Sequence, residues 1–329
     1  MEQVEIRGLP RPVSRIGLGT WSIGGTQWTA TDEAEAVRTI HAALDHGVSL
    51  VDTAPVYGLG RAEEIVGHAL ATWRGERPLV ATKLGLDWRA GSARLDSSPK
   101  RVRAELDESL RRLRLQAVDL YQVGWLDDAT PVHETADALG ALVRAGKIRA
   151  VGACGLSAEQ VEALRARVPV AAVSAPYDLL ERGIEAHLLP YCRARAIPVI
   201  AYGALCRGLL SGRLSPATTF GGDDLRSADP KFQAPRYHAY LAAAAALDAF
   251  ARGAFGRTVL DLAIRWVLDQ PGVSVALWSA RRPSQLDPIP GALGWSLGAD
   301  ALARIEEIVR AHVGAPAGDA PAPERRPAP

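Results

Sequence analysis

The chain of 329 residues is 48% hydrophobic and 23% charged, with a formal net charge of +1. This composition is that of a globular protein large enough for one barrel or two smaller domains, and it gives no electrostatic case for a nucleic-acid partner or an anionic membrane surface. No run of about 18 apolar residues predicts a membrane span. Three widely spaced cysteines, Cys154, Cys192 and Cys206, favour free thiols in a reducing cytoplasm over a disulfide framework or a metal site.

In chain order, short apolar runs alternate with amphipathic segments that begin at helix-capping residues. Residues 2–15 carry the glycine and prolines of a hairpin, which we expect to form a lid before the first strand. The predicted strands are 16–21, 49–52, 78–83, 118–125, 148–154, 170–175, 197–202 and 274–279. The predicted helices are 31–46, 60–73, 98–113, 130–146, a helix from the capping box at 157, and then 183–195, 236–252, 257–269 and 299–313.

This alternation predicts the fold class. Eight strand–helix units without a break in composition indicate a single α/β domain, a (β/α)8 TIM barrel over residues 1–315, with a long loop at 213–235 after the seventh strand. A doubly wound sheet is disfavoured because Gly17-Leu-Gly19 lacks the third glycine of a dinucleotide-binding fingerprint. Residues 316–329, rich in Pro and Ala, are expected to be a disordered tail.

Three reactive side chains follow neighbouring predicted strands. Asp52 and Lys83 end the second and third strands, and Tyr57 lies in the loop between them. The carboxyl ends of barrel strands meet on the face where such barrels keep their chemistry. A nearby ammonium lowers the pKa of a phenol, whose ordinary value is about 10, so we expect Tyr57 to act as a proton donor or acceptor tuned toward the working pH. Taken singly, the same residues also fit a structural ion pair with an aromatic at the rim.

Motifs along the chain resemble those of the aldo-keto reductase family, in the same order. They are VDTAPVYG, ATKLG, VDLYQVGW, GKIRAVGACGLS, PYDLLER and AYGALCRGLLSGR, and the resemblance covers roughly residues 2–315. The resemblance implies a (β/α)8 barrel that transfers a hydride from NADPH to a carbonyl. It also implies that Tyr57 is the general acid, that Lys83 activates it, and that Asp52 is the partner of Lys83.

The resemblance further implies where NADPH would bind. The diphosphate would lie along the loop after strand seven and the adenosine phosphate after strand eight, where adjacent Arg281 and Arg282 suit a 2′-phosphate; a solvated basic turn fits these arginines equally well. Tyr177 would stack on the nicotinamide. The expected cofactor residues are Gly19, Thr20, Trp21, Asp52, Cys154, Gly155, Ser174, Tyr177, Gly203, Ala204, Leu205, Arg207, Gly208, Leu210, Ser279, Arg281, Arg282 and Gln285.

The chain departs from the family pattern at positions that face the nicotinamide and the carbonyl. The resemblance implies a catalytic tetrad whose fourth member is a histidine, and Gly124 occupies the position of that missing histidine. Cys154-Gly155 replaces a Ser-Asn pair that holds the nicotinamide carboxamide, and Ser174 replaces a glutamine. Lost positioning groups ordinarily reduce catalysis by orders of magnitude.

Three interpretations follow from these changes. The first is a reductase whose bulky or self-orienting substrate fills the space at Gly124. The second is a redox-neutral acid–base enzyme, an isomerase, lyase or cyclase, with weakened or lost nicotinamide binding. The third is a non-catalytic binding barrel, against which the retention of Asp52, Tyr57 and Lys83 speaks. We rank the reductase first. A pocket formed by Trp21, Trp88, Trp125 and the 213–235 loop would favour a hydrophobic or planar small molecule. No pattern indicates an oligomeric state.

Overall fold

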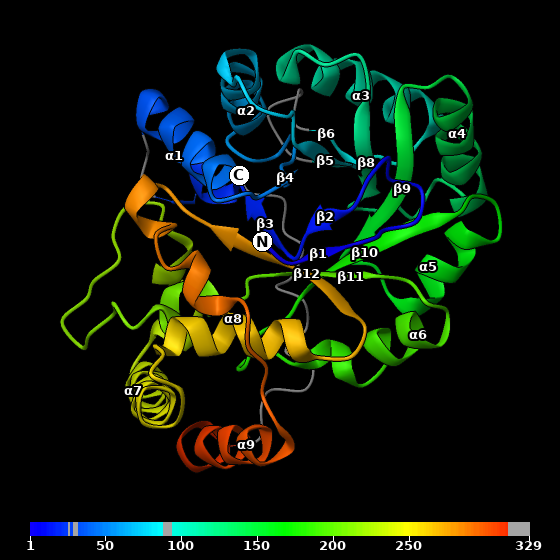
Figure 1. The fold of residues 1–329 in the computed structure, drawn as a ribbon. Helices are drawn as coiled ribbons and strands as arrows, with labels where there is room; N and C mark the ends of the chain where they lie inside the picture. Colours follow the sequence, from blue (N-terminus) through cyan, green and yellow to red (C-terminus); the bar gives the residue numbers. More distant parts are fainter. Residues whose placement is uncertain (26, 29–31, 88–93, 315–329) are drawn as a thin grey trace.

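The computed structural model describes residues 1–25, 27–28, 32–87 and 94–314. Within these residues, eight parallel strands close into a barrel in chain order (Figure 1). This confirms the predicted (β/α)8 fold class. The barrel strands are β3 (Ile16–Gly19), β4 (Leu50–Asp52), β5 (Leu79–Leu84), β8 (Val118–Val123), β9 (Ile148–Cys154), β10 (Val170–Pro176), β11 (Val199–Tyr202) and β12 (Val273–Ser279).

Helices surround the barrel, and four of those that the structure describes begin at a residue whose side chain caps the first turn. The Ser157 and Thr258 hydroxyls form reciprocal capping boxes with Gln160 and Asp261, which satisfies backbone N–H groups that a helix leaves unpaired at its start. The helices are α1 (Glu33–Asp45), α2 (Arg61–Thr72), α3 (Pro99–Leu113), α4 (Val132–Arg144), α5 (Ala158–Arg165), α6 (Leu188–Ala194), α7 (Arg236–Phe255), α8 (Val259–Asp269) and α9 (Ala299–Val313).

The predicted N-terminal hairpin is present as β1 (Gln3–Val4) and β2 (Val13–Ser14), paired antiparallel. Its apolar side chains, Ile6 and Val13, are buried together with Leu50 and Leu79, which lie at the N-terminal ends of their strands. The hairpin therefore covers the end of the barrel opposite to Asp52 and Lys83, and it is a plug for the barrel floor, not a lid over the site.

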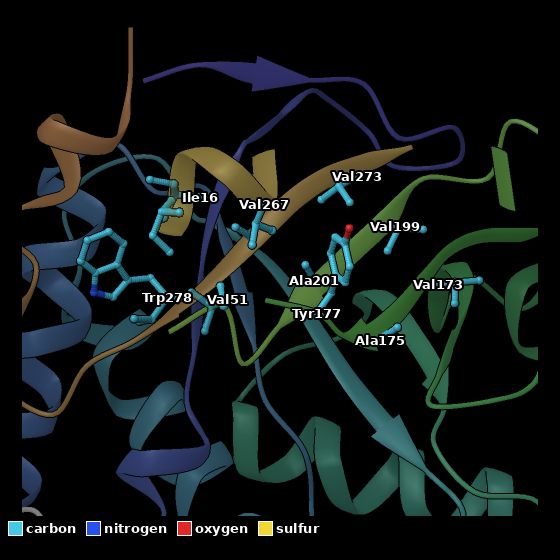
Figure 2. Packing of buried hydrophobic residues seen from close by; sticks show 14 of the residues in the cluster. Ile16, Val51, Val173, Ala175, Tyr177, Val199, Ala201, Val267, Val273 and Trp278 are labelled. Atoms are coloured by element: carbon cyan, nitrogen blue, oxygen red, sulfur yellow. The ribbon is translucent and has the colours of Figure 1, made fainter. Parts of the chain in front are cut away.

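Two apolar layers follow from the alternation of side chains along each strand. One layer fills the barrel interior and includes Leu50, Leu120 and Val275. The other lies between the strands and the helices; Figure 2 shows part of it, including Val173, Val199 and Trp278. Polar side chains at inward positions therefore stand out, because their neighbours within the barrel are apolar.

The loops at the carboxyl ends of the strands contain short elements that the sequence did not predict. A small hairpin, β6 (Leu86–Asp87) with β7 (Arg94–Leu95), extends from β5. The loop after β11 contains the 3-10 turns η3 (Cys206–Ser211), η4 (Leu225–Ser227) and η5 (Pro230–Phe232). Trp88 and the predicted disordered tail 316–329 lie outside the described residues. Among the helices that the structure describes, none is both long and apolar enough to cross a membrane.

Candidate active site

A buried ion pair joins the ends of β4 and β5. The Lys83 ammonium donates to Asp52 Oδ1 at 2.6 Å and to the backbone oxygen of Thr53 at 3.0 Å. Both charged residues are only 3% exposed. A buried charge requires a partner and further hydrogen bonds, and here the strand ends supply both. Asp52 and Lys83 therefore lie together, as the sequence predicted.

Tyr57 lies beside this pair, in the turn that follows β4. The centre of its ring is 5.0 Å from Lys83 Nζ. The turn is fixed by close backbone contact with the loop after β3: a Cβ on Gly24 would lie 2.7 Å from the carbonyl carbon of Tyr57, and a Cβ on Gly58 would lie 2.1 Å from the oxygen of Gly24. Glycine is thus required on both sides of the contact. Gly58 also has a φ of 63°, a conformation that glycine adopts at little cost.

The protein environment raises the pKa of Tyr57 instead of bringing it toward neutrality. Burial raises that pKa to about 12, and this outweighs the lowering effect of the Lys83 charge. For Lys83, burial opposes the charged form, but the neighbouring Asp52 carboxylate leaves the lysine pKa above its ordinary value. The expected direction of the tyrosine shift was therefore wrong. Tyr57 holds its proton at neutral pH, next to an ammonium that would stabilise the phenolate once the proton is given up.

One tryptophan of the loop after β3 packs on Tyr57, and a second packs on the first. Trp21, in the 3-10 turn η1 (Trp21–Ile23), stacks on the Tyr57 ring with centroids 6.0 Å apart and planes at 22°. Trp28 meets Trp21 edge-on at 5.7 Å. Trp125, half-buried, follows β8 at the same end of the barrel. Trp21 and Trp125 thus lie where a pocket was expected, and Trp28 was missed because nothing in its local pattern distinguishes it from a loop aromatic.

Gly124 follows β8 next to the ion pair. Its amide donates to the oxygen of Leu84 at 3.0 Å. A Cβ on Gly124 would lie 3.7 Å from Lys83 Cβ and 3.2 Å from the Leu84 oxygen. A side chain at position 124 would therefore start beside Lys83, and glycine places no side-chain atoms there.

The residues at the ends of β9 and β10 lie on the other side of the group. The Cys154 thiol is close enough for its charge to affect the pKa values of Tyr57 and Lys83. The Gly155 amide donates to the Ser174 oxygen at 2.9 Å. The Ser174 hydroxyl donates to the side chain of Gln122 at 2.5 Å. The structure thus brings Cys154, Gly155 and Ser174 to the same end of the barrel, and it adds Gln122 of β8, which the sequence analysis did not single out.

Tyr177 does not face this group. Its ring packs 5.2 Å from the Trp266 ring of α8, and its hydroxyl donates to Glu185 at 2.6 Å. Figure 2 shows it among the apolar side chains outside the barrel. The expectation that Tyr177 stacks on a nicotinamide is contradicted, because helix packing already occupies the ring.

Tyr202, the last residue of β11, takes the place expected for Tyr177. Tyr202 lies two residues after Ile200 of the interior layer, so the side chains of both residues point into the barrel. Burial raises the Tyr202 pKa, and the charges of Cys154, Tyr57 and Lys83 also act on it. Its side chain is only partly buried, so it offers an aromatic surface at the same end of the barrel as Tyr57.

The loop after β11 has an unusual backbone. Gly203 and Gly208 have φ values of 75° and 99°, and Cys206 and Arg207 between them have φ values of 47° and 52°. A Cβ on Gly203 would have no heavy atom of the described chain within 4 Å, so this backbone is open to a ligand. Arg207 forms an ion pair with Asp229 of the long loop. Of the other residues predicted for the diphosphate, Ala204 and Leu210 are buried and Leu205 is half-buried.

A group of arginines surrounds the segment after β12. The amides of Arg281 and Arg282 both donate to the Gln285 side chain, in the 3-10 turn η6 (Pro283–Gln285). Burial and the like charges of Arg226 and Arg282 lower the Arg281 pKa. The carboxylate of Asp224, 2.6 Å from Arg226, offsets only part of this repulsion. Arg226 was missed because it lies more than 50 residues away in the sequence.

The remaining predicted cofactor residues, Gly19, Thr20 and Ser279, lie at the carboxyl ends of the neighbouring strands β3 and β12. The Thr20 hydroxyl donates to the Asp52 backbone oxygen at 3.0 Å. A Cβ on Gly19 would lie 3.0 Å from the Ser279 hydroxyl. Gly19 and Ser279 are register partners in the β12–β3 pair. Because Gly19 has no side chain, it does not project above the strand ends at this part of the barrel.

The fold and the site together define a barrel oxidoreductase with a tyrosine–lysine–aspartate group. Residues 15–310 match the model of the Aldo/keto reductase family, and the chain belongs to this family, as its motifs indicated. It is 44% identical over 319 residues to the aldo-keto reductase YhdN of Bacillus subtilis (strain 168), an alignment that covers 97% of this chain and 96% of that protein.

Two further relatives carry more specific names. A glycerol dehydrogenase of Gluconobacter oxydans, AKR11B4, superposes with a TM-score of 0.89 at 47% identity, covering 96% of this chain and 97% of that one. An Escherichia coli (strain K12) protein named NADH-specific methylglyoxal reductase is 32% identical over 312 residues, covering 90% of this chain and 95% of that protein. The family supports oxidoreductase chemistry on a small molecule with a nicotinamide cofactor. It does not favour a redox-neutral or a non-catalytic barrel.

Proposed function

We propose that this protein interconverts a carbonyl compound and its alcohol with NADPH or NADP+, and that Tyr57 is the proton donor and acceptor. The observation that carries the proposal is the buried Lys83–Asp52 ion pair beside a tyrosine that keeps its proton at neutral pH. A proton donor beside a reacting carbonyl oxygen contributes typically 10²- to 10⁴-fold to the rate.

The residues of the chain fit a nicotinamide dinucleotide. The open, left-handed backbone around Gly203 and Gly208 suits a diphosphate, because amide groups there can approach an anion closely. The arginines around η6 suit a phosphate on the adenosine. Tyr202 offers a ring on the barrel side of Tyr57, and Cys154, Gly155 and Ser174 lie at the neighbouring strand ends. When bound, the nicotinamide supplies or accepts the hydride of the reaction.

The protein groups handle the proton. In the reducing direction, the Tyr57 hydroxyl donates its proton to the carbonyl oxygen, and the Lys83 ammonium stabilises the phenolate that remains. Asp52 keeps Lys83 charged and in place. Trp21, stacked on Tyr57, excludes water from one face of the phenol. In the oxidising direction the phenolate takes the proton of the alcohol, and the same ammonium makes that phenolate accessible.

We propose NADPH over NADH because Arg226 and Arg282 lie close enough to Arg281 for their charges to lower its pKa, and a group of guanidinium groups can bind a phosphate in a bidentate manner. The E. coli relative bears the name of an NADH-specific enzyme, so the preference is a property to measure on this chain. The Arg281→Ala variant should lose affinity for NADPH while its affinity for NADH changes little.

The substrate is proposed to be bulky or to orient itself. Gly124 provides no donor for the reacting oxygen and leaves volume beside Lys83, while Trp21, Trp28 and Trp125 supply apolar surface. A planar or aromatic carbonyl would fill this space. The relative from G. oxydans is named a glycerol dehydrogenase, which adds hydroxylated carbonyls, whose own hydroxyl occupies the space, to the classes to be tried.

The decisive experiment begins with fluorescence titration of the purified protein with NADPH and with NADH. We expect binding of NADPH, tighter than that of NADH, and NADPH-dependent reduction of members of an aldehyde and ketone panel. The Tyr57→Phe variant should bind NADPH normally and lose at least about 100-fold in kcat. No binding near millimolar cofactor, or full activity in Tyr57→Phe, would contradict the proposal.

A further inference from the structure

We propose that Gln122 and Ser174 are positioning residues that hold Asp52, and through it Lys83 and Tyr57, in the geometry for proton transfer. The inference rests on the proposed function and adds to it a role for two further side chains of the barrel interior. Gln122 then has a positioning role, and Ser174 has a positioning role in place of the cofactor contact that was expected from the sequence.

The side chains form a continuous chain of hydrogen bonds across the interior. The Ser174 hydroxyl donates to Gln122 Oε1 at 2.5 Å, the Gln122 amide donates to Asp52 Oδ2 at 2.8 Å, and Lys83 donates to Asp52 Oδ1 at 2.6 Å. Ser174 and Gln122 are 1% and 0% exposed. The chain therefore links β10, β8, β4 and β5 without solvent, and it ends at the ammonium beside Tyr57.

Because Asp52 is a carboxylate and can only accept, it fixes which atom donates in each hydrogen bond of this chain. If the Gln122 amide were rotated by half a turn, its oxygen would face the carboxylate, and two acceptors would be opposed in a buried place. The amide nitrogen must therefore point to Asp52, and the amide oxygen then accepts from Ser174. Each carboxylate oxygen of Asp52 thus has its own donor, and neither is free to rotate away from Lys83.

Backbone packing holds the Gln122 side chain in this position. Gln122 is the register partner of Lys83 on one side and of Gly152 on the other. A Cβ on Gly152 would lie 2.9 Å from Gln122 Cγ. Glycine at position 152 therefore leaves the room that the Gln122 side chain occupies. A methyl group there would displace the amide without removing it.

The sequence contains a matched control. Thr82, next to Lys83 on β5, is fully buried, and its hydroxyl donates to a buried carboxylate, Glu63, at 2.6 Å. Thr82→Val and Gln122→Leu each remove one donor from one buried carboxylate. Only the second carboxylate contacts the ammonium beside Tyr57. The two variants therefore separate loss of a buried hydrogen bond from loss of positioning.

The test compares Gln122→Leu, Ser174→Ala, Ser174→Thr and Gly152→Ala with Thr82→Val and the wild type. In each we would measure thermal stability, NADPH affinity, kcat in both directions against pH, and the alkaline near-ultraviolet titration of Tyr57, isolated by subtracting the corresponding Tyr57→Phe protein. The titration does not depend on catalysis.

We expect Gln122→Leu to lower kcat roughly 10- to 100-fold, with NADPH affinity within about twofold of the wild type. Its Tyr57 titration should move to higher pH, because a hydrogen bond that offsets part of the Asp52 charge is lost and that charge opposes phenolate formation. Ser174→Ala and Gly152→Ala should change kcat and the Tyr57 titration in the same direction but by smaller amounts. Ser174→Thr, which keeps the hydroxyl, should have wild-type values of both. Thr82→Val should lose only stability.

Wild-type kcat and an unmoved Tyr57 titration in Gln122→Leu and Ser174→Ala would overturn the inference while leaving the proposed function intact. Equal effects in Thr82→Val and Gln122→Leu would also overturn it, since they would show a structural role only. If Gln122→Leu does not fold, Ser174→Ala and Gly152→Ala decide by the same criteria. A wild-type protein that neither binds nor uses a nicotinamide would refute the proposed function instead, and the Tyr57 titration would still report on positioning.

Discussion

At the scale of single residues, the proton on Tyr57 is governed by two opposing effects. Burial raises the pKa of the phenol and the Lys83 ammonium lowers it, and burial is the larger effect. The sequence indicates the effect of the Lys83 charge on the Tyr57 pKa. It does not indicate the effect of burial, because burial depends on loops that are distant in the chain. Trp21, which covers the phenol, belongs to the loop after β3.

The dependence of activity on pH follows from this balance. Because the pKa of Tyr57 is raised to about 12, the protonated form required for carbonyl reduction is present throughout neutral and mildly alkaline pH. The phenolate required for alcohol oxidation increases about tenfold per pH unit below that pKa. We expect a nearly flat kcat for reduction between about pH 6 and 9, and a rising kcat for oxidation over the same range.

Steady-state kinetics in both directions, at saturating cofactor, would check this expectation, with Tyr57→Phe as the control for any residue other than Tyr57. A reduction rate that declines with an apparent pKa near 7 would show that the phenol is far more acidic than its burial implies.

The inward parity of Gln122 could have been read from the sequence, since it alternates with Leu120 along β8. Its partner could not, because Asp52 lies 70 residues earlier in the chain. The same alternation of side chains along a strand distinguishes Tyr177, which faces the helices, from Tyr202, which faces the barrel interior. Ser174 faces inward, so Tyr177, three residues later, faces the helices, whereas Tyr202 keeps the parity of Ile200. Recognition of a motif singled out Tyr177 after the sixth strand and passed over Tyr202 at the end of the seventh, and only alternation decides which one faces the site.

At the scale of elements, helix starts were predictable because capping chemistry is local. Both capping boxes, at Ser157 and Thr258, use residues within one turn. The loop after β11 was not predictable in the same way. Its left-handed residues include Cys206 and Arg207, and non-glycine residues carry no sequence signal for that conformation.

The two capping boxes predict different losses of stability. Thr258 begins α8, whose residues are almost all buried, whereas Ser157 begins α5, of which only Val161 and Leu164 are buried. Thr258→Ala should lower the free energy of unfolding by about 1–2 kcal/mol, and Ser157→Ala by about 0.5–1 kcal/mol. Chemical denaturation measures both values. An equal loss in the two variants would mean that burial of the helix does not amplify the loss of a cap.

At the scale of the whole molecule, the barrel separates its floor from its site. The alternation of strands and helices predicted this architecture, because eight similar units have few other ways to bury their apolar faces. The end of the barrel that the N-terminal hairpin covers was not predictable, since Ile6 and Val13 are ordinary apolar residues in sequence. Their contacts with Leu50 and Leu79 place the hairpin on the floor.

This separation predicts variants that affect stability alone. Ile6→Ala removes a side chain that is 3% exposed from the floor, and it should lower the free energy of unfolding by about 2–5 kcal/mol. Its kcat should equal that of the wild type where the protein is folded. Val143→Ala on α4, at a position 36% exposed, is the matched control and should change stability by less than about 0.5 kcal/mol. A changed kcat in folded Ile6→Ala would indicate that the floor and the site are coupled.

The contact between Gly24 and Gly58 bears on how the protein could be redesigned. The position of Tyr57 is set by backbone against backbone, whereas the substrate pocket that we propose is formed by the side chains of Trp21, Trp28 and Trp125. The position of the proton donor and the side-chain surface around it therefore depend on separate parts of the molecule. Libraries that vary the three tryptophans together with Gly124 can explore new substrates at a constant proton-donor position, provided that the two glycines are left untouched.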